Sequence, residues 1–384
     1  MEGHANGEAV LTQLRISRRT TFRAFVLGTC AVTVPSLLAA CGGSDEPPPV
    51  PTMSQGTAST TQPTSGDEAS DDSTTEGPQG ELTILQPLEI RHLDSSIWPG
   101  NIIQSASLLV MEPVVRRGED LEIHPFLAEK FEFVDNTTLR LTLRQNVPFH
   151  NGSILTVEDV VFTYRRVLDP NSMSGHARFM TTVASVDAID DSTVEIRLST
   201  PDARILGRLA LIGIVSKAVV EEVGDEAYDA DPVGTGPYTL KQWERGTQLT
   251  FEAFPDYWQG PPKIQTVTIR SVLEDSTRVA ELLSGGADIV VNVPSQSVPE
   301  IERSDIAEIQ AVTSLRTIFA FLNTHYPPFD DIRMRKAVNY AIDRQLIIDG
   351  VLDGFGVANH QLCTAEVLGY DPQLEGDYEY DPER

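Results

Sequence analysis

Alternating apolar and polar residues predict β-strands in the chain beyond residue 81. In the stretch 138–144, Leu139, Leu141 and Leu143 fall on one face and polar side chains fall on the other, which is the pattern of a half-buried strand. The same alternation, or a short buried apolar run, predicts further strands at 193–198, 249–253, 267–270 and 288–291. The globular part of the chain therefore contains several strands.

Apolar residues at helical spacing predict helices between these strands. Thr156 stands three residues before Asp159, a capping arrangement, and apolar residues then recur every three to four positions until Asp169. A second helix is predicted from Asp275 through Leu283, closed by two glycines. A long helix is predicted to start at 330–331, to run through Ile347 and to end before Gly354. Mixed strands and helices without a repeat period favour an α/β or α+β architecture of more than one lobe.

The first eighty residues predict an export signal and a tether. Four arginines between 15 and 23 precede an apolar run at 24–40, which is short for a membrane span and suits a signal peptide, residues 1–40. The run ends in Leu38-Ala39-Ala40-Cys41, which resembles the bacterial lipobox, so Cys41 is expected to be acylated and to anchor the chain. Residues 41–80 are acidic and rich in Ser, Thr, Pro and Gly, and predict a disordered tether.

The export route is left open by the sequence. Residues 17–22, Ser-Arg-Arg-Thr-Thr-Phe, resemble a twin-arginine signal, but the aromatic residue comes one position late. Both the twin-arginine and the general secretory route are therefore considered.

Charge and cysteine content exclude several classes of function. A formal net charge of -27 argues against a nucleic-acid partner, because such surfaces need clustered Lys and Arg. Three cysteines cannot form a disulfide framework, and Cys363 is expected to be a small buried apolar side chain. No Cys-x-x-Cys, paired-histidine helix, Gly-x-Ser-x-Gly or phosphate-loop motif occurs, so we predict no metal site, no cofactor and no catalytic residues.

Two short motifs are expected to have structural roles. His150, between Phe149 and an Asn-Gly turn, is expected to form structural hydrogen bonds rather than to act in catalysis. The glycines of Gly234-Thr235-Gly236-Pro237 predict a tight turn with positive φ or a close approach of two backbone segments.

Several blocks in order along the chain resemble the family-5 bacterial solute-binding proteins. The blocks are MEPVV at 111–115, PFLAEKFE at 125–132, LTLRQNVPFHNG at 141–152, LTVEDVVF at 155–162, PVGTGPY at 232–238, PDYW at 255–258, LSGGADI at 283–289, FLNT at 321–324, PFDDIRMRKA at 328–337 and AIDR at 341–344. The resemblance covers the chain from about residue 81 to its last residue. It implies an α/β fold of the periplasmic-binding-protein type (class II, cluster C), a two-lobed Venus flytrap with an extra domain.

The resemblance also implies how the chain is divided. The solute-binding part is 81–384, with 81–112 and about 190–290 as the first lobe, 113–189 as the extra domain and about 291–384 as an incomplete second lobe. The final residues 380–384 resemble the start of the family's next helix, so the chain is expected to be truncated at its C-terminus, without the segment that completes the second lobe.

The function that the resemblance implies is solute capture for an ABC importer, not catalysis. The expected ligand is an oligopeptide or dipeptide, and the expected partners are permease subunits with their ATPases; the protein is expected to be an extracytoplasmic monomer. Ligand contacts are expected from six residues, Trp98, Met111, Trp258, Phe319, Phe321 and Asn323. Nickel chelate, opine or oligosaccharide stay open as ligands, and a surface sensor or chaperone, or a secreted hydrolase, stay open as other classes.

Overall fold

The computed structural model describes residues 12–18, 77–367, 369–374 and 378–384. Cys41, the tether and most of the predicted signal peptide lie outside the described residues. The exception is residues 12–18, which form a strand. Within the described residues, no helix is both long enough and apolar enough to cross a membrane.

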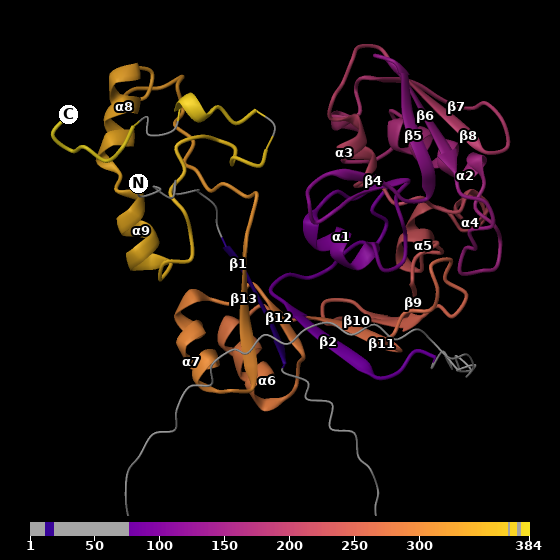
Figure 1. Cartoon of the computed structure of the whole chain (residues 1–384), viewed down its shortest axis with the longest axis horizontal. Helices are drawn as coiled ribbons and strands as arrows, with labels where there is room; N and C mark the ends of the chain where they lie inside the picture. The colour runs from indigo at the N-terminus through magenta and orange to yellow at the C-terminus, as the bar shows by residue number, and fades with distance from the viewer. Residues whose placement is uncertain (1–11, 19–76, 368, 375–377) are drawn as a thin grey trace, which may run out of the picture. The chain divides into compact units, whose positions relative to one another are not determined.

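Strands and helices alternate irregularly along the chain (Figure 1). The strands are β1 (Thr12–Arg18), β2 (Glu81–Gln86), β3 (Val115–Arg117), β4 (Ile123–Pro125), β5 (Ala128–Asp135), β6 (Thr138–Leu143), β7 (Val183–Ala188), β8 (Thr193–Leu198), β9 (Tyr238–Glu244), β10 (Gln248–Ala253), β11 (Thr266–Ser271), β12 (Ile289–Val291) and β13 (Ala307–Thr313). The helices are α1 (Asn101–Ser107), α2 (Val157–Leu168), α3 (Ile205–Leu209), α4 (Lys217–Val223), α5 (Asp225–Ala230), α6 (Asp275–Ser284), α7 (Val298–Arg303), α8 (Ile332–Ala341) and α9 (Arg344–Val351).

The largest sheet has seven strands in the order β13-β1-β12-β2-β11-β10-β9. β2 runs parallel to both β11 and β12, and every other neighbouring pair is antiparallel. The predicted strands at 249–253, 267–270 and 288–291 are confirmed as β10, β11 and β12. This sheet continues past residue 290, as far as Thr313 in β13.

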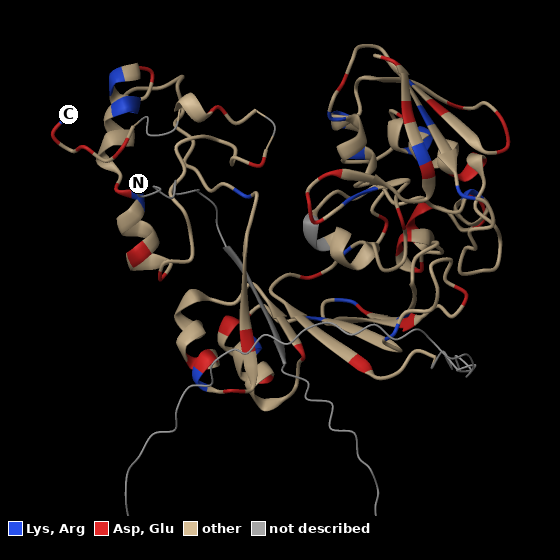
Figure 2. Ribbon diagram, viewed as in Figure 1, with Lys and Arg blue, Asp and Glu red and all other residues tan. Residues whose placement is uncertain are grey.

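A four-stranded antiparallel sheet, β5-β6-β8-β7, packs against α2. The prediction for β6 is confirmed, because Leu139, Leu141 and Leu143 are buried. Helix α2 begins as predicted, with a capping box between Thr156 and Asp159. Other side chains of these strands form ion pairs, for example Arg140 of β6 with Glu195 of β8 at 3.0 Å. Figure 2 shows acidic and basic residues close together on this sheet.

Helix predictions in the last third of the chain are confirmed in one case and wrong in the other. Helix α6 ends at a left-handed Gly285 (φ 94°), as predicted. The single long helix predicted from 330 is wrong: the chain forms α8 and α9 instead. Asp343 breaks the run, because its carboxylate accepts a hydrogen bond from the Leu346 backbone N–H (2.9 Å) and so caps a new helix.

Candidate functional site

The loop that follows β2 carries Trp98 and contains a buried aspartate that bonds to the chain around it. Asp94 is fully buried and accepts hydrogen bonds from the backbone N–H (2.9 Å) and the hydroxyl (2.6 Å) of Ser96. A short aspartate that bonds the chain two residues ahead fixes a tight turn. The turn therefore determines where the next residues, including Trp98, lie.

Arg166 of α2 forms an ion pair with Asp94. Its Nη1 lies 2.8 Å from Asp94 Oδ2 and donates to the Ser96 hydroxyl at 2.8 Å, while Nη2 lies 2.8 Å from Asp225. The Arg166 side chain is 8% exposed. Burial would lower the pKa of Arg166, but the charges of Asp94 and Asp225 outweigh it and raise that pKa. The loop is thus joined to α2 by a buried ion pair.

Helix α5 holds the start of the same loop through Asp229. The carboxylate of Asp229 accepts hydrogen bonds from the backbone N–H groups of Leu93 and Asp94, both at 2.8 Å, and lies 2.8 Å from Nδ1 of His92. The His92 ring stacks on Trp98 at 3.8 Å between centroids, with 15° between the planes. Trp98 is half-buried, so part of its ring stays open to solvent.

The segment 174–176 supports the loop from another direction. His176 Nε2 donates to the Ser95 carbonyl (2.9 Å), and the Ser174 hydroxyl donates to the Ser96 carbonyl (3.1 Å). Burial lowers the pKa of His176. Asp94, Ser95 and Ser96 are therefore held by groups from three separate parts of the chain.

A second polar cluster is centred on Glu112, which is 2% exposed. Its carboxylate accepts hydrogen bonds from Tyr257 (2.5 Å), Trp258 Nε1 (2.8 Å) and the Thr235 hydroxyl (2.9 Å). Burial raises the pKa of Glu112, and the hydrogen bonds from Tyr257 and Trp258 only partly offset this. These hydrogen bonds join three separate segments of the chain, at residues 112, 235 and 257–258.

The Gly-Thr-Gly-Pro motif lies directly against the backbone of the segment 109–110. A Cβ on Gly234 would lie 1.9 Å from the Val110 carbonyl oxygen, and one on Gly236 would lie 2.5 Å from that of Leu109. Of the two predicted alternatives, the close backbone approach is the one that the structure shows, and neither glycine has a positive φ. His150 spans the motif: its Nε2 donates to the Gly236 carbonyl (2.9 Å) and its Nδ1 accepts from Gly234 N–H (3.3 Å), which confirms its structural hydrogen bonding.

The predicted ligand residues fall into separate groups in the structure. Trp258 is half-buried and bonded to Glu112, whereas Met111, the residue before Glu112, is fully buried in an apolar cluster. Phe319 and Phe321 form an edge-to-face pair (4.8 Å), and Phe321 is 89% exposed. Asn323 is exposed and its carboxamide oxygen accepts from His325 N–H (3.1 Å). Cys363 is half-buried, less buried than predicted.

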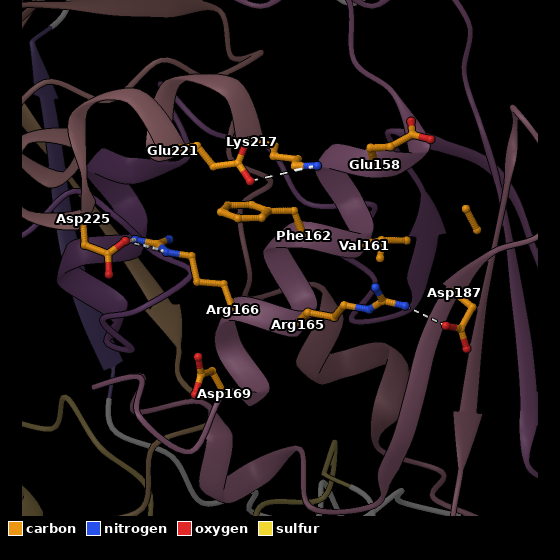
Figure 3. A pocket seen from close by; sticks show the side chains of 11 residues that line it. Glu158, Val161, Phe162, Arg165, Arg166, Asp169, Asp187, Lys217, Glu221 and Asp225 are labelled. Carbon is orange, nitrogen blue, oxygen red and sulfur yellow. Dashed lines mark hydrogen bonds and ion pairs between the residues drawn. The ribbon is translucent and has the colours of Figure 1, made fainter.

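A cavity of about 670 Å³ lies beside α2, α4 and α5 and is lined by charged side chains (Figure 3). Its cations are neutralised within the lining: Arg165 pairs with Asp187 at 2.7 Å, Arg166 pairs with Asp225, and Lys217 lies 4.0 Å from Glu221. Phe162 supplies an apolar part of the wall. Because each of these cations has an acidic partner, the cavity offers no unpaired positive charge to a ligand, while the carboxylates of Glu158 and Asp169 add negative charge to its lining.

Across the described residues, no group of three or more His, Cys, Asp or Glu side chains could hold a metal ion. Trp98, Met111 and Trp258 were predicted from the sequence, whereas the polar side chains beside them, Asp94 and Glu112, were not. One signal was available for Glu112, because it is a lone carboxylate in an apolar run.

Comparison with known proteins gives a consistent result. The model of the bacterial extracellular solute-binding proteins, family 5 (middle region), matches residues 122–384. Heme-binding protein A of Haemophilus influenzae and the dipeptide-binding protein of Escherichia coli are each 28% identical over 287 residues, covering 68% of this chain and 52% and 54% of those relatives. The oligopeptide-binding protein AppA of Bacillus subtilis, solved with a nonapeptide, superposes with a TM-score of 0.69 at 24% identity, over 80% of this chain and 63% of AppA.

These similarities determine the fold and the family. The likeness to AppA confirms the predicted α/β fold of the periplasmic-binding-protein type. The chain spans about half the length of the curated relatives it matches. Because the family model covers well over half of the chain, the chain belongs to the family-5 bacterial extracellular solute-binding proteins.

Proposed function

We propose that the protein is the solute-binding lipoprotein of an ABC importer and that it captures oligopeptides or dipeptides for a membrane permease and its ATPases. The observation that carries this proposal is the family match over residues 122–384. The relative named as a dipeptide-binding protein supports a peptide as ligand. The protein itself performs no chemistry in this proposal.

The ligand contacts that we propose are the six residues nominated from the sequence. Three of them, Trp98, Phe319 and Phe321, present aromatic surface to solvent, and Asn323 adds an exposed carboxamide. Aromatic faces beside polar groups suit a peptide, which offers apolar side chains and backbone hydrogen-bonding groups. Trp258 and the buried Met111 would shape the wall through the Glu112 cluster.

The arrangement of the chain is part of the proposal. Residues 1–40 are a signal peptide, Cys41 is acylated, residues 41–80 are a tether, and the protein works as a monomer on the outer side of the cell membrane. The remaining chain forms a first lobe, an extra domain and an incomplete second lobe. Exposed apolar residues on α8 and α9 support an incomplete lobe: Ile332, Leu346, Ile347 and Val351. Bound solute then favours the closed form of the lobes, which the permease recognises.

Binding is tested with the 1–384 chain carrying Cys41→Ser, which cannot be acylated, and with a form carrying any further residues that its gene encodes. Thermal unfolding is measured with di- to pentapeptides, nickel-histidine, an opine, an oligosaccharide and hemin. Peptides are expected to raise the melting temperature in at least the longer form. Stabilisation by another of these solutes alone would reject the peptide assignment, and hydrolysis of a peptide would reject the assignment as a binding protein.

The contacts are tested by isothermal titration of the form that binds. Trp98→Ala and Phe321→Ala are each expected to weaken peptide binding at least about tenfold, because aromatic contacts dominate such sites. Phe179→Ala is the matched control, since Phe179 is 45% exposed on a short helical turn outside the proposed contacts. Equal affinity in all three variants would remove these residues from the site.

A further inference from the structure

His92 lies between a carboxylate and the indole ring of Trp98. Its Nδ1 atom is 2.8 Å from Asp229 Oδ2, and its ring stacks on Trp98 with 3.8 Å between the centroids and 15° between the planes. The other oxygen of Asp229 accepts hydrogen bonds from the backbone N–H groups of Leu93 and Asp94. One carboxylate of α5 therefore holds both the imidazole and the backbone that follows it. The His92 side chain is 32% exposed, so water reaches it.

The hydrogen bond to Asp229 determines which nitrogen of His92 gains a proton. An ionised carboxylate only accepts hydrogen bonds, so Nδ1 of neutral His92 carries the hydrogen and Nε2 carries none. Histidine changes charge between about pH 5 and 8, and the added proton binds Nε2. The resulting cation lies on the face of Trp98, well within the distance of about 6 Å at which an indole attracts a cation.

We propose that His92 is a positioning residue that holds Trp98 more firmly when it is protonated, so that the protein binds its solute more tightly at mildly acidic pH. This inference rests on the proposed function, because it takes Trp98 to be a ligand contact. Protonation adds a cation–π attraction to Trp98 and converts the hydrogen bond to Asp229 into an ion pair. An indole that is already held in place loses less freedom when a ligand binds to it.

Several other charged side chains surround His92. They are Glu89, Arg91 and Asp94 in the same loop, Arg166 of α2, His176, Asp225 and Asp229 of α5, and Arg245, which donates to the Arg91 carbonyl. Arg166 is engaged by Asp94 and Asp225, whereas Asp229 bonds directly to the imidazole. The direct partner of His92 is therefore an anion, which pairs with the charge that protonation adds. His176 bonds to the same loop, so its effect is separated in the test.

NMR measures the stack and the proton together in the ligand-free protein. The 1–384 chain with Cys41→Ser is labelled at its histidine carbons, and spectra are recorded from about pH 8 to 5, where histidine changes charge. The signals of His92 are identified by their absence in His92→Phe. They are expected to be shifted upfield by the ring current of Trp98, and to lose this shift in Trp98→Leu.

Tryptophan fluorescence reports the same event from the side of the indole. Emission is expected to fall as His92 gains its charge, with the same midpoint as the NMR titration, because a charged imidazole in contact with an indole quenches it. His92→Phe keeps a ring on Trp98 without a proton, so the pH-dependent fall should be absent. His124→Phe is the matched control and should keep the fall, since His124 also pairs with an aspartate, Asp120 at 2.9 Å. His176→Gln should keep it too.

Isothermal titration with trialanine measures the consequence for binding, in the form of the protein that binds peptide. Neither end of this peptide changes charge much between about pH 7 and 5.5. The affinity is expected to be about two- to fivefold higher at the lower pH. It should be nearly the same at both pH values in His92→Phe, and weaker at both in His92→Ala, which removes the stacked ring.

Three results would overturn the proposal. They are the absence of an upfield shift at His92, a fluorescence change that persists in His92→Phe, and equal affinity for trialanine at the two pH values. If no form of the protein binds trialanine or another peptide, the peptide assignment fails. The ligand-free spectra still decide whether a proton on His92 acts on Trp98.

Discussion

Replacement of Arg166 by alanine is the most direct test of the loop that carries Trp98. Arg166 is 8% exposed and its guanidinium lies 2.8 Å from Asp94, whose side chain is 1% exposed. Arg165, the preceding residue on α2, also forms an ion pair, at 2.7 Å with Asp187, but those two side chains are 60% and 51% exposed. Both neighbouring arginines pair with an aspartate, but Arg166 is far more buried and also contacts Asp225 and Ser96.

Burial determines the expected size of the two effects. Arg166→Ala leaves the carboxylate of Asp94 buried and unpaired, which costs about 3–5 kcal/mol of unfolding free energy. The pair of Arg165 and Asp187 is screened by water, so the loss of that pair costs about 1 kcal/mol or less. For a unit of about 150–250 residues, these values correspond to falls in melting temperature of at least about 6 °C and of about 4 °C or less, respectively.

Differential scanning calorimetry of the 1–384 chain with Cys41→Ser measures both variants. The double variant Arg166→Ala/Asp94→Asn separates the buried charge from the lost packing of the arginine side chain. It is expected to recover about half of the loss, because the neutral carboxamide that replaces the carboxylate still has an oxygen to accept from Ser96. Similar melting temperatures for Arg165→Ala and Arg166→Ala would refute the reasoning, and so would a double variant less stable than Arg166→Ala.

The remaining predictions concern the Glu112 cluster and the glycine motif. Glu112→Ala is expected to lower the unfolding free energy by about 3 kcal/mol, because it leaves buried donors unsatisfied, and Glu112→Gln is expected to lower it less. Burial raises the pKa of Glu112 above 4.5, so the stability that its protonated carboxyl contributes is present below that pH and is lost as the pH rises. Urea unfolding should therefore show that the destabilisation caused by Glu112→Gln becomes smaller as the pH rises. Gly234→Ala is expected to lower the unfolding free energy by more than about 3 kcal/mol in the same assay, because its Cβ would overlap the Val110 carbonyl. Gly350→Ala on α9 is the control: a Cβ there meets open space, so the change should be neutral or slightly stabilising. Burial lowers the pKa of His150 below 6.5, so the protein should lose stability as the pH falls through that range, and His150→Gln should reduce the loss measured by thermal unfolding between about pH 7.5 and 5.

Local patterns were sufficient for much of the secondary structure. The alternation in Leu139, Leu141 and Leu143 gave β6 with the correct buried face, and the capping residues Thr156 and Asp159 gave the start of α2. The helix beyond residue 330 was predicted as one piece because its apolar spacing continues through Asp343. Whether an aspartate inside such a run stays in the helix or caps a new one depends on its hydrogen bond to the backbone, which spacing alone does not reveal.

The sequence by itself was sufficient for the fold class and the family resemblance. It also predicted the leader, the lipid anchor and the aromatic residues proposed for ligand contact. The tertiary structure decided which polar side chains hold those residues in place. Arg165 and Arg166 are equivalent in sequence, and only the fold buries Arg166 against Asp94, which lies 72 positions earlier. The fold alone also brings Glu112 to Tyr257 and Trp258, because hydrogen bonds between residues far apart in the chain depend on how the strands and helices pack.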